Sequence, residues 1–155
     1  MTTLRFTDQF KSLLNLARQL VSETNADAIL LLLEGPADWS RLRNLAGDAN
    51  LIVAADTEEE LKGAKEAGLK CVAVELPGSP VYDRIAQAIL EAVADDLLSS
   101  GCRIVALYSG FEATNIDSVS VIRLGEHLNR LTGRDLRELE TRVPLETLKL
   151  VVDLA

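Results

Sequence analysis

Residues 102–124 read CRIVALYSGFEATNIDSVSVIRL, and this stretch decides the fold. The apolar run IVALY predicts a buried strand over residues 103–108, and the polar–apolar alternation after Asp117 predicts a second strand over residues 117–124. The connection between them, residues 109–116, is eight residues long. Because a parallel crossover needs about a dozen residues or more, we predict that the second strand runs antiparallel to the first at an edge of a sheet.

Toward the N-terminus, strands alternate with helices. Apolar runs predict strands at residues 28–33, 51–55 and 70–76. Apolar residues spaced by three and four predict helices at residues 7–22 and 80–99. Capping residues and terminating glycines predict two more helices, at residues 39–46 and 58–67. Since such alternation produces right-handed parallel βαβ units, we predict an α/β fold. It is a three-layer α/β/α sandwich whose mixed five-stranded sheet has the order 3-2-1-4-5, with strand 5 antiparallel.

Single residues mark the ends of these helices. Thr7 or Asp8 is suited to start the first helix. For the long helix at residues 80–99, we expect Ser79 as the N-cap, Pro80 at the first helical position and Gly101 as the terminator.

The composition indicates one acidic globular domain. The chain has 155 residues, of which 48% are hydrophobic and 26% charged, and its net charge is −8. Such a charge repels phosphate backbones and anionic lipids, so we expect neither nucleic acid nor membrane as a partner. The N-terminus lacks the apolar core of a signal peptide, and the apolar run at residues 28–33 is too short to cross a bilayer. We therefore expect a cytoplasmic protein in which Cys71 and Cys102 are free thiols.

A ligand crevice is expected where the strand order reverses. Ligands of open α/β sheets bind beyond the carboxyl ends of the strands at this point, which here lies between strands 1 and 4. Two loops would form its walls, at residues 34–38 and 109–115. The candidate ligand-binding residues are Gly35, Asp38, Arg41, Ser109, Gly110, Thr114 and Asn115. For the second loop two readings stay open: its polar groups bind a ligand, or they satisfy the amides of their own turn.

The first loop, EGPAD, is a poor phosphate site. It precedes a helix N-terminus, which attracts anions, but Glu34 and Asp38 place two negative charges there. It also lacks the lysine and the second glycine of a phosphate-binding loop. The simpler interpretation of Asp38 is a helix N-cap.

Residues for catalysis or metal binding are sparse. His127 is the only histidine of the chain and lies outside the expected crevice, so no nucleophile–base pair can be assigned. The acidic run at residues 58–60 suits the first turn of a helix better than a metal site. We therefore expect no catalytic residue, no metal site and no cofactor in this chain.

The central stretch resembles the C-terminal domain of pyruvate kinase. IVALYSG, FEATN and IDSVSVIRL follow that family's order of a strand ending in small residues, a glycine-containing loop with a Thr-Asn pair, and a last strand. The order of elements agrees over residues 7–124. The resemblance implies the same sandwich and a regulatory role, which in some pyruvate kinases involves a sugar-phosphate effector bound by a Ser/Thr-rich loop. EGPAD lacks that Ser/Thr run, so effector binding is not carried over, and the catalytic barrel of pyruvate kinase is absent.

After residue 124 the alternation of strands and helices stops. For residues 125–155 we predict only short helices, at residues 126–131, 135–140 and 145–154. GRDLRELETRVPLETLKLVVDLA looks like the segment that leads into the diadenylate cyclase (DNA-integrity-scanning) domain. The Asp-Gly-Ala and Arg-His-Arg motifs of that cyclase are absent here. The resemblance implies a first domain at residues 1–124 and a helical extension at residues 125–155 that leads into a further domain.

Three functional hypotheses follow. The leading one is a non-catalytic regulatory domain of a larger cytoplasmic protein, such as a diadenylate cyclase, that senses a small-molecule effector. The second is a homo-oligomerisation scaffold that binds no ligand. The third is a small stand-alone enzyme acting on a nucleotide or a sugar, for which the sequence offers no set of catalytic groups.

Overall fold

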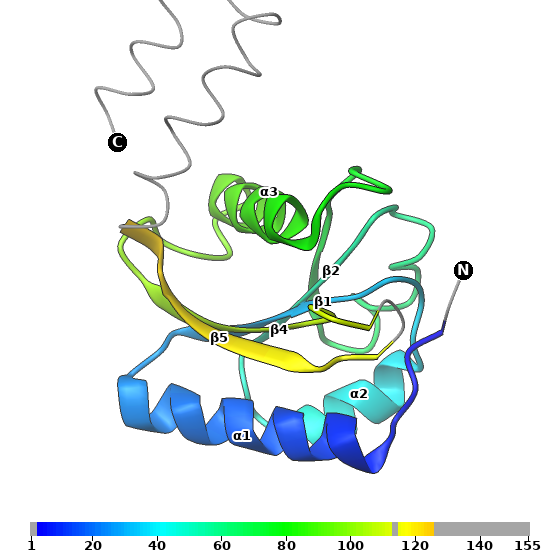
Figure 1. Ribbon diagram of the computed structural model, residues 1–155, viewed down its shortest axis with the longest axis horizontal. Helices are drawn as coiled ribbons and strands as arrows, with labels where there is room; N and C mark the ends of the chain where they lie inside the picture. Colours follow the sequence, from blue (N-terminus) through cyan, green and yellow to red (C-terminus); the bar gives the residue numbers. More distant parts are fainter. Residues whose placement is uncertain (1–2, 113–114, 126–155) are drawn as a thin grey trace, which may run out of the picture.

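A computed structural model describes residues 3–112 and 115–125 of the protein. These residues form one five-stranded sheet with helices on both faces (Figure 1). In chain order the elements are α1 (Asp8–Thr24), β1 (Ala28–Leu32), α2 (Trp39–Ala46), β2 (Leu51–Ala55), β3 (Lys70–Ala73), α3 (Val81–Ala94), β4 (Arg103–Tyr108) and β5 (Ser118–Arg123).

The sheet has the predicted order, β3-β2-β1-β4-β5. The pairs β1–β2, β1–β4 and β2–β3 are parallel, and β4–β5 is antiparallel with Arg103 opposite Arg123 and Tyr108 opposite Ser118. The short connection between β4 and β5 therefore has the consequence expected from its length. The order reverses between β1 and β4, as predicted.

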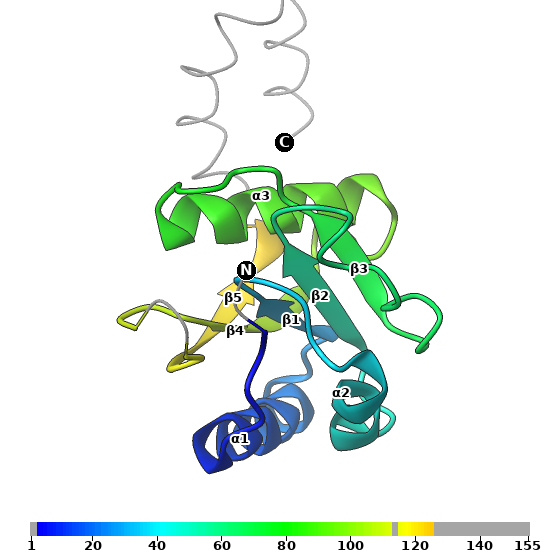
Figure 2. The same cartoon turned by 90° about the vertical axis from the view of Figure 1, so that its right-hand side faces the viewer.

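The helices form two layers around the sheet (Figures 1 and 2). Helices α1 and α2 cover one face, and α3 covers the other. Every residue of β1 is buried. Ile29 and Leu31 belong to the core on the α1 and α2 side, whereas Leu30 and Leu32 belong to the core under α3. A strand covered on both faces explains why β1 is an unbroken apolar run.

Capping residues set the ends of α1 and α2. Thr7 Oγ1 accepts a hydrogen bond from the N–H of Phe10 at 3.1 Å, and Asn25 ends α1 with a left-handed backbone at φ +56°. Asp38 Oδ1 accepts a bond from the N–H of Arg41 at 3.2 Å and so caps α2. Both caps follow the sequence-based expectation.

The prediction of a helix over residues 58–67 is wrong, because this segment is a run of turns. Trp39 provides the reason. Its Nε1 donates a hydrogen bond to the carbonyl of Lys62 at 2.8 Å, which engages an acceptor that a helix would use internally. Gly63 follows at φ +94°, and a Cβ there would lie 3.1 Å from the Trp39 ring. Packing against Trp39 therefore overrides the helical propensity of the segment.

Two further boundaries differ from the predictions. Pro80, not Ser79, is the N-cap of α3, and the helix ends at Ala94, well before Gly101. Strand β3 ends at Ala73, because Glu75 has a left-handed backbone at φ +57° that turns the chain away from the sheet. The helices predicted within residues 126–155, and His127, lie outside the described residues.

Candidate functional site

The two loops expected to form the crevice do meet where the strand order reverses. Gly35 and Ser109 line a gap there together with Leu33, Glu34, Ile116 and two residues of the N-terminal segment, Thr3 and Leu4. The gap has a volume of only about 10 Å³, which is about the space of one water molecule. The crevice therefore exists, but it is almost filled.

The N-terminal segment, residues 3–6, fills it. The N–H of Leu4 donates to the carbonyl of Pro36 at 2.9 Å. Phe6 packs edge-on against Phe10, with ring centroids 5.7 Å apart and an interplanar angle of 83°. Figure 2 shows the start of the chain beside the ends of β1 and β4. The segment thus occupies the position where other open α/β sheets bind ligands.

Asp38 and Arg41, both predicted to bind a ligand, are not among the residues that line the gap. The carboxylate of Asp38 caps α2. The guanidinium of Arg41 stacks on the ring of Phe6, 4.5 Å from its centroid, which is a cation–π contact. These contacts tie the first loop to the N-terminal segment.

The second loop closes on Asp117. The N–H of Gly110 donates to Oδ1 at 2.7 Å, and the N–H groups of Phe111 and Glu112 donate to Oδ2 at 3.0 and 2.8 Å. Ser118 Oγ adds a bond to Oδ1 at 2.8 Å. Burial would raise the pKa of Asp117, but these hydrogen bonds to the carboxylate outweigh it and hold the pKa below its usual value. The carboxylate thus occupies the anion position that the backbone amides create.

The remaining predicted residues of this loop support its shape. Asn115 Nδ2 donates to Glu112 Oε2 at 2.7 Å. A Cβ on Gly110 would lie 2.6 Å from Ser118 Oγ, so the close approach of the loop requires glycine. Thr114 lies outside the described residues. Of the predicted residues that the structure describes, Gly35 and Ser109 alone line the gap.

A buried arginine stands beside the crevice, and the sequence predictions did not include it. Arg84 of α3 is 4% exposed. Its Nη1 lies 3.0 Å from Glu34 Oε1, its Nη2 lies 3.2 Å from Asp56 Oδ1, and Nη2 also donates to the carbonyl of Leu33. Glu34 was expected to contribute an unpaired negative charge to the first loop, but its carboxylate is paired with Arg84. The sequence does contain an indication of this buried arginine, because a charged residue at position 84 interrupts the apolar stripe of the helix.

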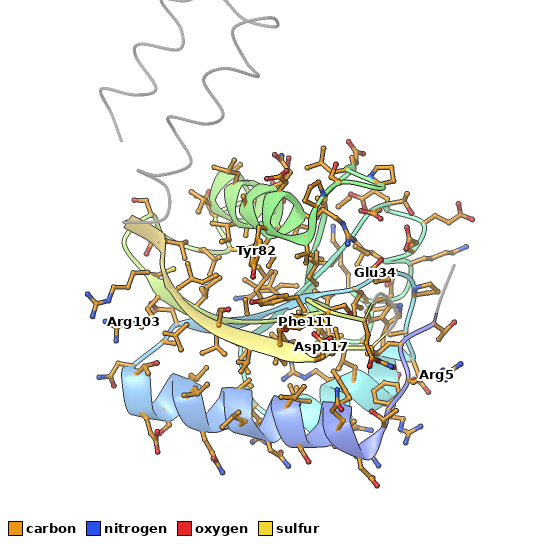
Figure 3. The ribbon with its side chains drawn as sticks, in the orientation of Figure 1. Arg5, Glu34, Tyr82, Arg103, Phe111 and Asp117 are labelled. Atoms are coloured by element: carbon orange, nitrogen blue, oxygen red, sulfur yellow. The ribbon has the colours of Figure 1, made fainter. Side chains whose placement is uncertain are left out.

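The sequence indicates the role of Asp117 less clearly than that of Arg84. Aspartate often binds nearby backbone amides in turns, but the sequence does not say which of several acidic residues does so. Figure 3 shows Glu34 and Asp117 toward the same end of the sheet, with Arg103 at the opposite end. The polar groups around the crevice thus bind one another.

The described residues contain few side chains that could bind a metal or take part in redox chemistry. No cluster of three or more His, Cys, Asp or Glu residues is placed to hold a metal there. Cys71 and Cys102 are free, and burial is the main cause that raises the pKa of each thiol. Among the helices of the described part, none is long and apolar enough to cross a membrane.

Comparisons with known proteins agree with this architecture. A family model described as "Probable sensor domain DacZ_P" matches residues 9–132. The fold is similar to that of Cryptosporidium parvum pyruvate kinase, solved in complex with ADP, with a TM-score of 0.60 and 18% sequence identity. That match covers 76% of this chain and 24% of the kinase, so the chain spans about a quarter of its length. No curated protein sequence matches the chain significantly.

Proposed function

Because this chain belongs to the family of the probable sensor domain DacZ_P, we propose that it is a non-catalytic domain that senses a small molecule and regulates a larger cytoplasmic protein. The family match is the observation that carries the proposal. The crevice gives it a physical basis, because it lies where the strand order reverses and residues 3–6 nearly fill it. A ligand that enters must displace residues 3–6, and this displacement would be the signal.

The chemistry of the crevice favours an uncharged polar ligand. Arg41 stacks on Phe6, and Arg84 is paired with Glu34 and Asp56. The amides of the second loop already hold the carboxylate of Asp117. A phosphate in the gap would meet the carboxylate of Glu34, and no arginine is among the described residues that line it. A neutral molecule could bond to Gly35 and Ser109, which line the gap, and the sequence-based proposal that Thr114 and Asn115 also contribute is kept.

The regulated partner that we propose is a diadenylate cyclase. The support is the resemblance of the segment that ends at Ala155 to the approach to such a domain, together with the regulatory role implied by the pyruvate kinase-like fold. In this proposal residues 1–124 are the sensor and residues 125–155 connect it to the cyclase. The residues encoded after Ala155 test this directly, and any sequence unrelated to a cyclase there contradicts it.

Amide NMR of the labelled full chain tests the crevice. We would titrate adenosine and glucose, and in parallel their charged forms AMP and glucose 6-phosphate. The expected result is saturable shifts of the Gly35 and Ser109 amides with a neutral member. Ser109→Ala should weaken binding, whereas Ser99→Ala, an exposed serine outside the loops, should not. Absence of shifts at these amides at the highest soluble concentrations would contradict the crevice as the sensing site.

A homo-oligomeric scaffold remains the second candidate, favoured by one observation. Strand β5 is an edge of the sheet, and its Val121 is 44% exposed. An edge strand can pair with a second copy. Sedimentation velocity of the chain and of Val121→Lys tests it: a dimer that the substitution dissociates supports the scaffold, and a monomer over the accessible concentration range excludes it.

A further inference from the structure

The N-terminal segment that closes the crevice is held by three groups of different chemistry. The carbonyl of Pro36 accepts the N–H of Leu4 at 2.9 Å. The guanidinium of Arg41 covers the Phe6 ring, 4.5 Å from its centroid. The ring of Phe10 meets that of Phe6 edge-on, with 5.7 Å between the centroids. We call the place bounded by Pro36, Arg41 and Phe10 the Phe6 slot.

The Phe6 slot adjoins the gap at the point where the strand order reverses. Leu4 lines the gap, and the Cα atom of Phe6, two residues further along, is at most about 7.6 Å from that of Leu4. Both side chains are partly buried and pack against the core. Figure 3 shows Arg5, which lies between them in the chain, at the same end of the sheet as Glu34. Displacement of the segment would therefore join the gap and the slot into one larger crevice.

Two of the groups that form the slot interact with the segment and with little else. Among the described residues, the N–H of Leu4 is the one hydrogen-bond donor to the Pro36 carbonyl. Of the carboxylates in the same part of the chain, none forms an ion pair with Arg41. A ligand that takes the place of the segment therefore meets a free carbonyl acceptor and an uncovered guanidinium.

These groups define the chemistry of such a ligand. A carbonyl oxygen requires a donor, and the N–H of Leu4 supplies it now. A guanidinium stacks on the face of an aromatic ring, and an aromatic neighbour such as Phe10 favours an edge-on contact with a second ring. An uncharged heteroaromatic ring that carries an N–H group meets all of these requirements in one small molecule.

We propose that the ligand of the crevice is an uncharged heteroaromatic molecule with an N–H donor, such as a nucleobase or nucleoside, and that the ring of Phe6 takes its place when it is absent. This rests on the proposed function and names the ligand class of the same site. The ligand's ring stacks on Arg41, and its N–H group donates to the Pro36 carbonyl. Its remaining polar groups meet Gly35 and Ser109, which line the gap.

Amide NMR of the labelled full chain tests this with three uncharged probes. Adenosine has both the ring and an exocyclic amino group, purine riboside has the same ring system without that group, and glucose has no aromatic ring. We expect adenosine to cause saturable shifts of the Leu4 amide, because the bond to Pro36 is exchanged. Purine riboside should bind about fivefold more weakly, since it lacks the donor, and glucose should leave the Leu4 amide unchanged.

Substitution of Phe6 separates competition from a merely structural role. Phe6→Ala should bind adenosine at least about threefold more tightly than the wild type, because the competing ring is removed. Phe6→Leu keeps an apolar side chain but no ring, and gives the same comparison if Phe6→Ala does not fold. Arg5→Ala, an exposed neighbour in the segment, is the matched control and should bind like the wild type.

Arg41→Gln is introduced into the Phe6→Ala chain, so that loss of the guanidinium does not also release the segment. Adenosine should bind to this double variant about fivefold more weakly than to Phe6→Ala, because the stacking contact is lost. Arg18→Gln in the same background removes an arginine of α1 that is not part of the slot, and should have no effect on affinity. Circular dichroism verifies that each variant is folded.

The outcomes distinguish the ligand class from the sensing role. Shifts of the Gly35 and Ser109 amides with glucose and none with adenosine would overturn the ring assignment and leave the proposed function standing. No binding of any probe to the wild type or to Phe6→Ala would contradict both. Unchanged or weaker adenosine binding in Phe6→Ala would contradict the competition by Phe6, and equal affinities of adenosine and purine riboside would contradict the bond to Pro36.

Discussion

The two ends of the sheet are built from the same strands and differ in how much space their side chains leave open. At the carboxyl ends of β1 and β4 the gap is about 10 Å³, because residues 3–6 fill it and the nearby charges pair internally. At the amino ends a pocket of about 550 Å³ is open, and two arginines line it. The reversal of strand order defines where a ligand can bind, but the side chains decide whether the place is vacant.

The largest expected effect concerns the paired charges of the filled end. Arg84→Met should destabilise the domain by about 3 kcal/mol, because it leaves the carboxylates of Glu34 and Asp56 without their buried partner. Urea unfolding followed by circular dichroism measures this. Arg18→Gln, at a part-exposed arginine whose ion pair with Asp48 is 3.9 Å long, is the comparison and should cost less than about 0.5 kcal/mol. Equal losses for the two variants would mean that burial does not decide what an ion pair of this domain contributes.

Removal of residues 1–6 should have the next largest effect. Leu4 and Phe6 pack against the core, and the loss of their apolar burial should cost about 2 kcal/mol in the free energy of unfolding. Arg5→Ala, in the same segment but exposed, is the control and should change stability by less than about 0.5 kcal/mol. If the truncated chain is as stable as the full one, the segment does not close the crevice in solution.

A smaller effect is expected for Asp117→Asn. At neutral pH the loss should be about 1 kcal/mol, as for other side chains that cap backbone amides. The folded-state pKa of Asp117 is lowered, so its contribution is complete above the ordinary aspartate pKa and disappears as the pH falls through the lowered value.

Wild type and Asp117→Asn should therefore converge in stability in acid. Urea unfolding at neutral pH and at about pH 2.5 measures this convergence. Asp48→Asn, which changes a fully exposed aspartate, is the control and should differ in stability from wild type by less than about 0.5 kcal/mol at neutral pH. A gap between wild type and Asp117→Asn that persists in acid would mean that the carboxylate charge is not what holds the loop.

The sequence predicted the sheet well because strand order depended on local features. Unbroken apolar runs marked β1, β2 and β4, and the length of one loop set the direction of β5. The contacts of the site were harder to predict, because they join residues that lie far apart in the sequence. The bond from Trp39 to Lys62, which replaces a helix with turns, spans 23 positions, and that from Arg84 to Glu34 spans 50. Residues 3–6 carry no periodicity that could reveal where they pack.

Trp39 has a practical consequence as well. It is the only tryptophan of the chain, it is 7% exposed, and its indole nitrogen is bonded to the carbonyl of Lys62. Its fluorescence emission therefore serves as a built-in optical reporter of the turns at residues 58–68. A red shift of that emission, at a denaturant concentration where the circular dichroism of the helices is unchanged, would mark local detachment of this segment before the rest of the domain unfolds.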